Sequence, residues 1–383
     1  MQTYFNQLQS KNYLKDYSNN HFIIRAIMDD KEEIKARLSQ FQPIPINNIS
    51  FTGPGNPVIS QQRGLFDCSP DNFTLNSAKV IEFLHNFFGS AFDGFIREQL
   101  AAGKKNYTDE KFFQAMSEVH LLSFLATCVG KVKNKIYEPR IGNNGKNPEA
   151  CFEFDNGTKI NIEVKTPDYS QCLHRGCSKW IQPAVAYERS YLRLSSVVKR
   201  AGYALINPSI NKTKDFINSA CEKFLPVNNT REFNILAINY YGHPWGDMAI
   251  VGGYCSLMNE TTGILCSKKT REKLNISKDI SRISAFILYQ CTADTLLTSD
   301  IRYSWPLIRL VRNPLCPDID FYKLNKMLRF NTTDYLLPKT IGGDITDMRN
   351  YIFYNSPDDI VEEDNLVQIY QALCEAQGLF IQS

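Results

Sequence analysis

Residues 147–167 read NPEACFEFDNGTKINIEVKTP. Apolar and polar side chains alternate on both sides of Asp155-Asn156-Gly157, and such a tripeptide between alternating runs is typical of a tight hairpin turn. The stretch therefore predicts two antiparallel strands, at 149–154 and 159–166. Pro167 ends the second strand, because proline has no N–H group to donate to a neighbouring strand.

The length of the turn decides which side chains of this hairpin face each other. A two-residue Asn-Gly loop would pair Glu149 with Val164. A three-residue loop, with Gly157 in the left-handed conformation, instead pairs Glu149 with Glu163. In that register the two carboxylates lie on one face, with their Cβ atoms about 5 Å apart. Two negative charges at this distance are costly unless a cation lies between them.

A hard divalent cation would relieve this repulsion. Mg²⁺ takes oxygen ligands and often only one or two carboxylates, and Mn²⁺ is a plausible substitute. Lys165 shares the face of Glu163, because strand side chains two residues apart point the same way. An isolated Glu-x-Lys is also common on an exposed strand face that carries one cross-strand ion pair, so the spacing alone leaves both interpretations open.

The arrangement resembles the PD-(D/E)XK nuclease superfamily, with Pro148-Glu149 in place of Pro-Asp and Glu163-Val164-Lys165 as the E-x-K. The first acid departs from the usual pattern, since Glu is one methylene longer than Asp. The resemblance implies that Glu149, Glu163 and the backbone carbonyl of Val164 bind the metal ion. It further implies that Lys165 positions or activates the attacking water, and that Glu118 supports the site from a preceding helix.

We expect the helix that carries Glu118 at residues 108–130. Thr108 is a good N-terminal cap and Gly130 suits the C-terminal end. Glu118 lies in the same apolar stripe as Leu122 and Leu125, and an acid there needs a partner or a metal ion. The alternative is that Glu118 lies at the edge of the stripe and reaches water.

The resemblance also implies the fold and its divisions. We expect an α/β protein with a restriction-endonuclease-like core, in which helices flank a mixed central sheet, at residues 105–255. Residues 1–104 predict a mainly helical N-terminal accessory region. Residues 256–383 predict a C-terminal extension packed on the core.

A basic segment follows the hairpin. Arg189, Arg193 and Arg200 fall on one helical face, and Lys179 precedes them. This face is a candidate for binding a nucleic-acid backbone, although a solvated helix face explains it equally well. The net charge of +3 provides no global basic field, so any such binding depends on local patches.

Cysteine usage and hydropathy indicate the cellular compartment. The eleven cysteines form no regular framework and no apolar leader is present, so we expect reduced thiols in a cytoplasmic protein without a membrane span. Cys172, His174 and Cys177 lie close in sequence, with Cys151 as the nearest spare thiol for a zinc site. A closed zinc site requires four ligands, which makes this alternative weak.

The sequence thus favours a Mg²⁺-dependent nuclease that hydrolyses phosphodiester bonds, with DNA as the expected substrate and RNA left open. Restriction, other defence and DNA repair are all compatible with it, as are a homodimer and a partner subunit. The alternative is a non-catalytic nucleic-acid- or protein-binding module that retains a nuclease-like fold. Two facing carboxylates weigh against that alternative, because a disused site has no reason to keep them.

Overall fold

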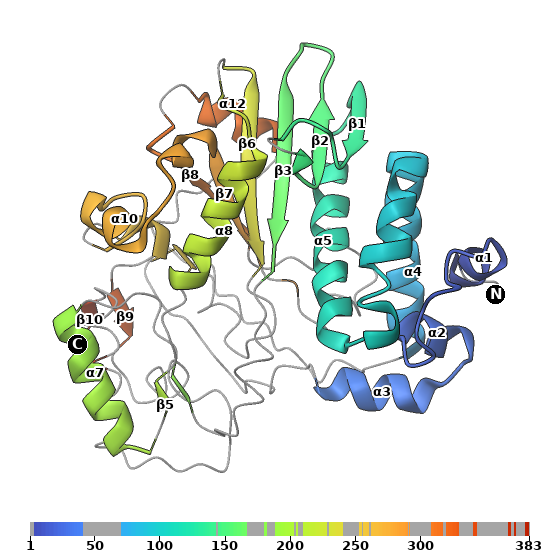
Figure 1. Cartoon of the computed structure of the whole chain (residues 1–383), viewed down its shortest axis with the longest axis horizontal. Coiled ribbons are helices and arrows are strands. Elements are labelled where there is room, and N and C mark those ends of the chain that lie inside the picture. Colours follow the sequence, from blue (N-terminus) through green and yellow to red (C-terminus); the bar gives the residue numbers. More distant parts are fainter. Residues whose placement is uncertain are drawn as a thin grey trace.

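The structure is a computed structural model of the 383-residue chain. The residues it describes are 4–40, 70–142, 145–166, 180–181, 188–202, 204–205, 210–227, 230–239, 253–254, 256–259, 262–289, 291, 308–316, 319–328, 340–342, 367–368, 371–372 and 380–382. Within them the protein is a mixed α/β fold in which helices flank a six-stranded mixed sheet (Figure 1).

The six-stranded sheet has the order β1-β2-β3-β6-β7-β8. Strands β1, β2 and β3 form an antiparallel meander, β3, β6 and β7 are parallel, and β7 and β8 are antiparallel. Their bounds are β1 Asn134–Tyr137, β2 Ala150–Glu153, β3 Lys159–Lys165, β6 Glu232–Asn239, β7 Ala285–Tyr289 and β8 Ile308–Arg312. The central strands β6 and β7 are buried almost throughout, as expected of parallel strands covered on both faces.

Helices precede the sheet in the chain and also fill its crossovers. Before the sheet come α1 Tyr4–Ser10, α2 Phe22–Ile27, α3 Lys31–Gln40, α4 Pro70–Phe88, the short η1 Gly89–Phe92, η2 Phe95–Gln99 and η3 Lys104–Asn106, and α5 Asp109–Cys128. Between β3 and β6 lie β4 Trp180–Ile181, α7 Glu188–Arg200, β5 Ala204–Leu205 and α8 Ile210–Lys223. Later elements are α10 Lys268–Leu274, η5 Lys278–Arg282, α12 Phe321–Leu328, β9 Thr340–Gly342 and β10 Phe380–Gln382.

Two apolar clusters cover the two faces of the sheet. On one face Ile162 and Ile235 pack with side chains of α4, α5 and α12 and with the N-terminal helices. On the other face Leu236 and Phe286 pack with α8 and η5. Since side chains alternate along β3, the face of Glu163 is opposite to that of Ile162 and is therefore the α8 face.

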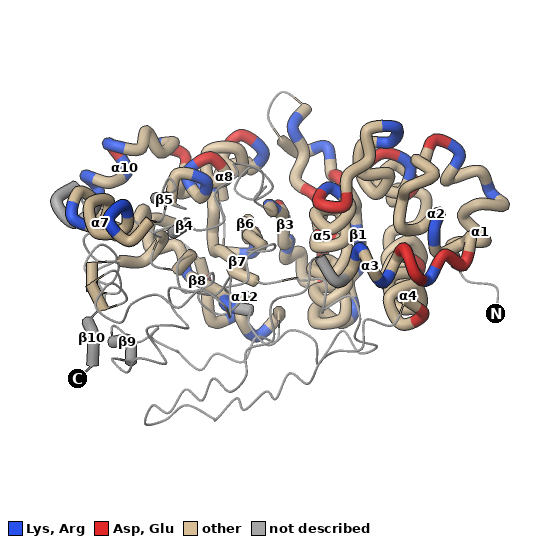
Figure 2. The backbone as a smooth tube through the Cα atoms, turned by 90° about the horizontal axis from the view of Figure 1, so that it is seen from below, with Lys and Arg blue, Asp and Glu red and all other residues tan. Residues whose placement is uncertain are grey.

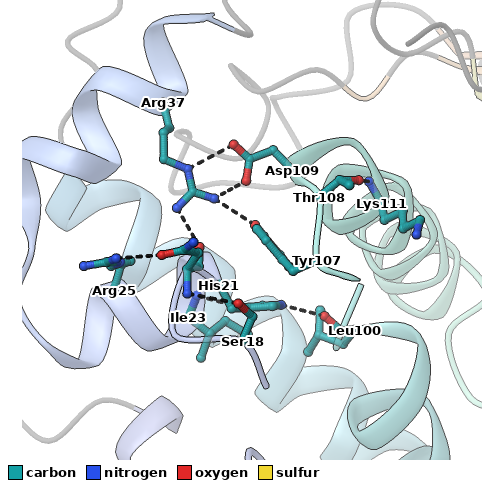
Figure 3. A network of polar contacts seen from close by, with 11 residues as sticks. Ser18, His21, Ile23, Arg25, Arg37, Leu100, Tyr107, Thr108, Asp109 and Lys111 are labelled. Atoms are coloured by element: carbon teal, nitrogen blue, oxygen red, sulfur yellow. Dashed lines mark hydrogen bonds and ion pairs between the residues drawn. The ribbon is translucent and has the colours of Figure 1, made fainter. Parts of the chain in front are cut away.

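The helix α5 begins and ends where the sequence predicts. The Thr108 hydroxyl accepts a hydrogen bond from the backbone N–H of Lys111 at 3.3 Å, and Gly130, with φ +67°, follows the last turn. Arg37 of α3 clamps the start of this helix (Figure 3). Its guanidinium donates to both carboxylate oxygens of Asp109 and to the Tyr107 hydroxyl, and it lies over the Phe22 ring. These contacts fix α5 against the N-terminal helices.

The expected mixed sheet and flanking helices are confirmed, and the described elements before residue 104 are helices. β7 and β8 lie beyond residue 255 yet belong to the same sheet, so the sheet is larger than the predicted core segment. No helix in the described part of the chain is both long and apolar enough to cross a membrane.

Candidate active site

The hairpin of β2 and β3 adopts the three-residue turn. Phe154 and Thr158 close it, with the Thr158 carbonyl accepting the Phe154 N–H at 2.9 Å, and Gly157 has φ +76°. Cys151 pairs with Asn161 and Ala150 with Ile162. Just before the ladder, the backbone N–H of Glu149 donates to the Ile162 carbonyl at 2.9 Å. The three-residue turn and the pairing of Cys151 with Asn161 are therefore as predicted, and the same register continued by one residue would set Glu149 opposite Glu163.

A lysine ammonium group lies between these two carboxylates. Lys223 Nζ is 2.8 Å and 2.9 Å from the two oxygens of Glu163, and it donates to Glu149 Oε1 at 3.3 Å. The Glu163 side chain is completely buried. The cation that the facing acids require is thus provided, in this structure, by the protein itself.

Lys165 adds a second positive charge on the same face. Its Nζ lies 2.7 Å from Glu163 Oε1, and its side chain keeps 23% of its surface exposed. Lys165 therefore contacts one acid, whereas Lys223 contacts both. Two carboxylates and two ammonium groups together give a cluster without net charge.

Lys223 reaches the site because α8 packs on this face of the sheet. Ile217, Ala220 and Phe224 are buried against Leu236 and its neighbours, and Lys223 lies three residues after Ala220 at the edge of that stripe. Lys223 is not among the site residues predicted from the sequence. A cation beside an apolar stripe, on the helix that leads into β6, is the signal that could have found it.

Burial and charge both act on the ionisable groups. Burial, followed by the negative charge of Glu163, raises the pKa of Glu149 to about 7, although Lys223 and Lys165 act against the rise. Burial lowers the pKa of Lys223, but the charges of Glu149 and Glu163 outweigh this and raise the pKa above its ordinary value. The ammonium form of Lys223 is thus favoured next to the acids.

Glu118 approaches from the opposite side of the sheet. It is buried on α5 and accepts a hydrogen bond from the Tyr137 hydroxyl at 2.8 Å. Burial, with the charge of Glu149 second, raises the pKa of Glu118 well above its ordinary value. Among the described residues no hydrogen bond or ion pair joins Glu118 to Glu149, Glu163 or Lys165, so it is a neighbour of the pair rather than a member.

Two backbone carbonyl oxygens of β3 point toward the β2 side of the strand. The Ile162 carbonyl points toward β2, where it accepts the Glu149 N–H. The Val164 carbonyl, two residues further, points to the same side, beyond the last pairing of β2 with β3. This carbonyl and the two carboxylates are oxygen ligands of the kind that Mg²⁺ takes. Nowhere in the described ranges do three or more His, Cys, Asp and Glu side chains group as a metal site.

The predicted nucleic-acid contacts are placed only in part. Arg193 and Arg200 are exposed on α7, Arg189 lies in α7 but its side chain falls outside the described residues, and so does Lys179. Figures 1 and 2 draw α7 to one side of the sheet, away from β3. In Figure 2 the lysine and arginine segments occur across the whole width of the molecule rather than in one stripe.

The candidate zinc ligands Cys172, His174 and Cys177 also lie outside the described residues. The remaining thiol, Cys151, is buried in β2, and burial raises its pKa to about 11. A raised pKa disfavours the thiolate that zinc requires.

Comparisons with known proteins give no relative for this chain: no protein-family model, curated protein or solved structure matches it.

Proposed function

We propose that the protein is a metal-dependent nuclease whose active centre is the pair of facing acids, Glu149 and Glu163, with Lys165 beside them. The observation that carries this proposal is the ion-pair cluster at the hairpin, in which Lys223 contacts both buried acids and Lys165 contacts Glu163. Such a pair is costly to fold, and a role in binding a cation explains why the chain has it.

The topology supports the same proposal. A helix (α5), a strand (β1), an acid-bearing hairpin (β2 and β3), a helical crossover and a strand parallel to β3 (β6) follow in the order expected for the PD-(D/E)XK superfamily. We therefore infer a restriction-endonuclease-like core. Folds host many functions, so the residues of the site carry more weight than the topology.

Glu149, Glu163 and the Val164 carbonyl would hold the metal ion. Once bound, Mg²⁺ would polarise the phosphate oxygens and lower the pKa of a coordinated water. The protein's own contribution is position: strand β3 fixes Glu163 and Lys165 two residues apart, and the three-residue turn brings Glu149 to the same cluster.

Lys165 would stabilise the negative charge that develops during hydrolysis. In that reaction a water oxygen bonds to phosphorus, one phosphorus–oxygen ester bond breaks, the water loses a proton and the leaving oxygen gains one. An ammonium group held beside Glu163 can orient the water and stabilise the added negative charge on the phosphate. Glu118 and Tyr137 would support the pair from behind the sheet.

DNA remains the proposed substrate, with RNA as the alternative, and Arg193 and Arg200 as candidate backbone contacts. One observation favours the second candidate function, a non-catalytic binding module. Because Lys223 and Lys165 already neutralise the two acids, the cluster is satisfied without any metal ion.

The experiment that separates these functions is cleavage of plasmid, linear and single-stranded DNA, and of RNA, with Mg²⁺ or Mn²⁺ and with a chelator. We expect metal-dependent cutting by the wild type. Glu163→Gln and Lys165→Met should each reduce it by at least about 100-fold, the scale typical of removing one group that stabilises a transition state.

Glu153→Gln is the matched control. Glu153 lies on the same hairpin but faces Lys159 at the opposite end, so its removal should leave cutting unchanged. If folded wild type cuts none of the substrates with either metal ion, or if Glu163→Gln cuts as well as wild type, this site is not a nuclease centre.

A further inference from the structure

The ammonium group of Lys223 lies where a bound metal ion would have to lie. It is within 3.3 Å of an oxygen of each acid. Among the described residues, Lys223 is the cation that contacts both acids. A divalent cation that binds both carboxylates would use the same oxygens. Lys165 already contacts one of these oxygens, so a metal ion added beside both lysines would bring a large excess of positive charge into buried surroundings, where the repulsion is strong.

The structure also indicates which lysine can leave. Of the two acids Lys165 contacts Glu163 and not Glu149 in the described contacts, so it can stay beside Glu163 when the contact to Lys223 is exchanged. Lys223 keeps 18% of its side-chain surface exposed, and its ammonium group ends a flexible four-carbon chain. The backbone at this point is held in place, because Phe224 directly after it is buried in the core. The head group can therefore move while α8 does not.

We propose that Lys223 is a built-in counter-ion of the Glu149–Glu163 pair, which a divalent metal ion must displace, so that Lys223 sets the metal affinity of the site. In the metal-free protein Lys223 keeps two facing carboxylates compatible with folding. When a metal ion takes its place, the freed ammonium group stays tethered at the rim of the site. This inference rests on the proposed metal-binding function and specifies how that function is controlled.

The test is calorimetric titration of the full-length protein with Mn²⁺. Removal of the competing ammonium in Lys223→Met should tighten binding by about tenfold or more, which corresponds to a Lys223-displaced state populated one time in ten or less in the wild type. The matched control is Lys146→Met, which removes an equal charge from a nearby exposed pair with Glu222. It should bind Mn²⁺ as the wild type does.

Lys223→Met leaves two buried acids with one lysine, and this variant is at risk of misfolding. A second measurement therefore uses the wild type: brief acetylation of lysines, followed by mass spectrometry, with and without saturating Mg²⁺. We expect Mg²⁺ to increase the labelling of Lys223 several-fold and to leave Lys146 unchanged. An ammonium group released from its ion pairs is more accessible to the reagent.

The outcomes separate this inference from the proposed function. If Lys223→Met binds Mn²⁺ no more tightly than the wild type, or if Mg²⁺ does not increase the labelling of Lys223, the proposed displacement of Lys223 is wrong. The proposal that Glu149 and Glu163 bind a metal ion is not affected by that result. If neither protein binds Mn²⁺, or if Glu163→Gln binds it equally well, both the displacement and the proposed site are wrong.

Discussion

Glu163 is the single residue on which the site depends most. Its carboxylate is fully buried in a central strand, and both of its oxygens lie within 2.9 Å of an ammonium group. An uncompensated charge at such a place costs several kcal/mol. The lysines around it are therefore part of the fold as well as candidates for the chemistry.

The contact of Lys223 with the two acids could not be predicted from the sequence. Glu149, Glu163 and Lys165 belong to one hairpin, so alternation and turn chemistry were enough to place them on one face. Lys223 is 60 positions after Glu163 in the sequence. Its contact depends on how α8 crosses the sheet, which no local pattern specifies.

His21 is another buried ionisable residue, far from the site in sequence. Its Nε2 donates to the Leu100 carbonyl at 2.9 Å and its Nδ1 accepts the Ile23 N–H at 3.1 Å, which defines the neutral tautomer (Figure 3). Burial, with a smaller contribution from Arg37, lowers the pKa of His21 to about 3. A proton on Nδ1 would break the bond to Ile23.

This arrangement predicts a loss of stability in acid. Below pH 6.5 the unfolded chain binds a proton at His21 while the folded protein does not, until about pH 3. Each pH unit in that window should lower the free energy of unfolding by about 1.4 kcal/mol for this group. Urea unfolding between pH 7 and pH 5 should therefore show a shrinking stability difference between wild type and His21→Asn. A difference that does not change with pH would contradict the assignment.

At the scale of elements, the turn of the hairpin decides the site. A loop shorter by one residue would move Glu149 away from Glu163, since each one-residue slip turns the strand over. The tripeptide Asp155-Asn156-Gly157 predicted a tight turn, and the structure has the three-residue form with Gly157 in the left-handed conformation.

Gly157 gives a direct test of this turn. A Cβ atom at this position would meet only the end of Arg231, at 4.0 Å, so a substitution acts through backbone conformation rather than through a clash. We expect Gly157→Ala to lower the free energy of unfolding by about 1–2 kcal/mol, because its φ of +76° is unfavourable for alanine.

The matched variant is Gly157→Asn, measured by the same urea denaturation. Asparagine adopts the left-handed conformation more readily, so it should cost less than alanine. Equal losses for alanine and asparagine would show that the turn conformation is not what stabilises the hairpin.

Helix ends were predictable where a cap is present in the sequence. Thr108 and Gly130 gave α5 correctly, because one accepts a backbone N–H and the other adopts a positive φ. The start of α4 at Pro70 was not among the predicted helix ends. The proline itself was the missed signal, since proline is favoured in the first turn of a helix.

At the scale of the whole molecule, one apolar cluster joins the N-terminal helices to the sheet. Phe22 and Phe73 belong to the same buried cluster as Phe152 in β2 and Ile287 in β7. The segments 1–104 and 256–383, expected as accessory, thus contribute to the core that holds the hairpin. Local periodicity predicts each element, but it does not reveal which distant elements share a core.

The candidate site is a product of this assembly. The hairpin supplies Glu149, Glu163 and Lys165, and α8 supplies Lys223 from the crossover that leads to β6. The acids were predictable from sequence because the chain places them next to each other. Lys223, which contacts both acids, was not predictable, because it comes close to them only when α8 packs on the sheet.

The most direct test of the account is the position of a metal ion in crystals of the wild-type protein grown with Mn²⁺. We predict an anomalous-scattering peak between Glu149 and Glu163, about 2.1 Å from a carboxylate oxygen of each, the distance typical of Mg²⁺. Lys223 should then have left its bridging position, with Lys165 still beside Glu163. A structure without a peak there, in which Lys223 still bridges the two acids at saturating Mn²⁺, would contradict the proposed metal centre.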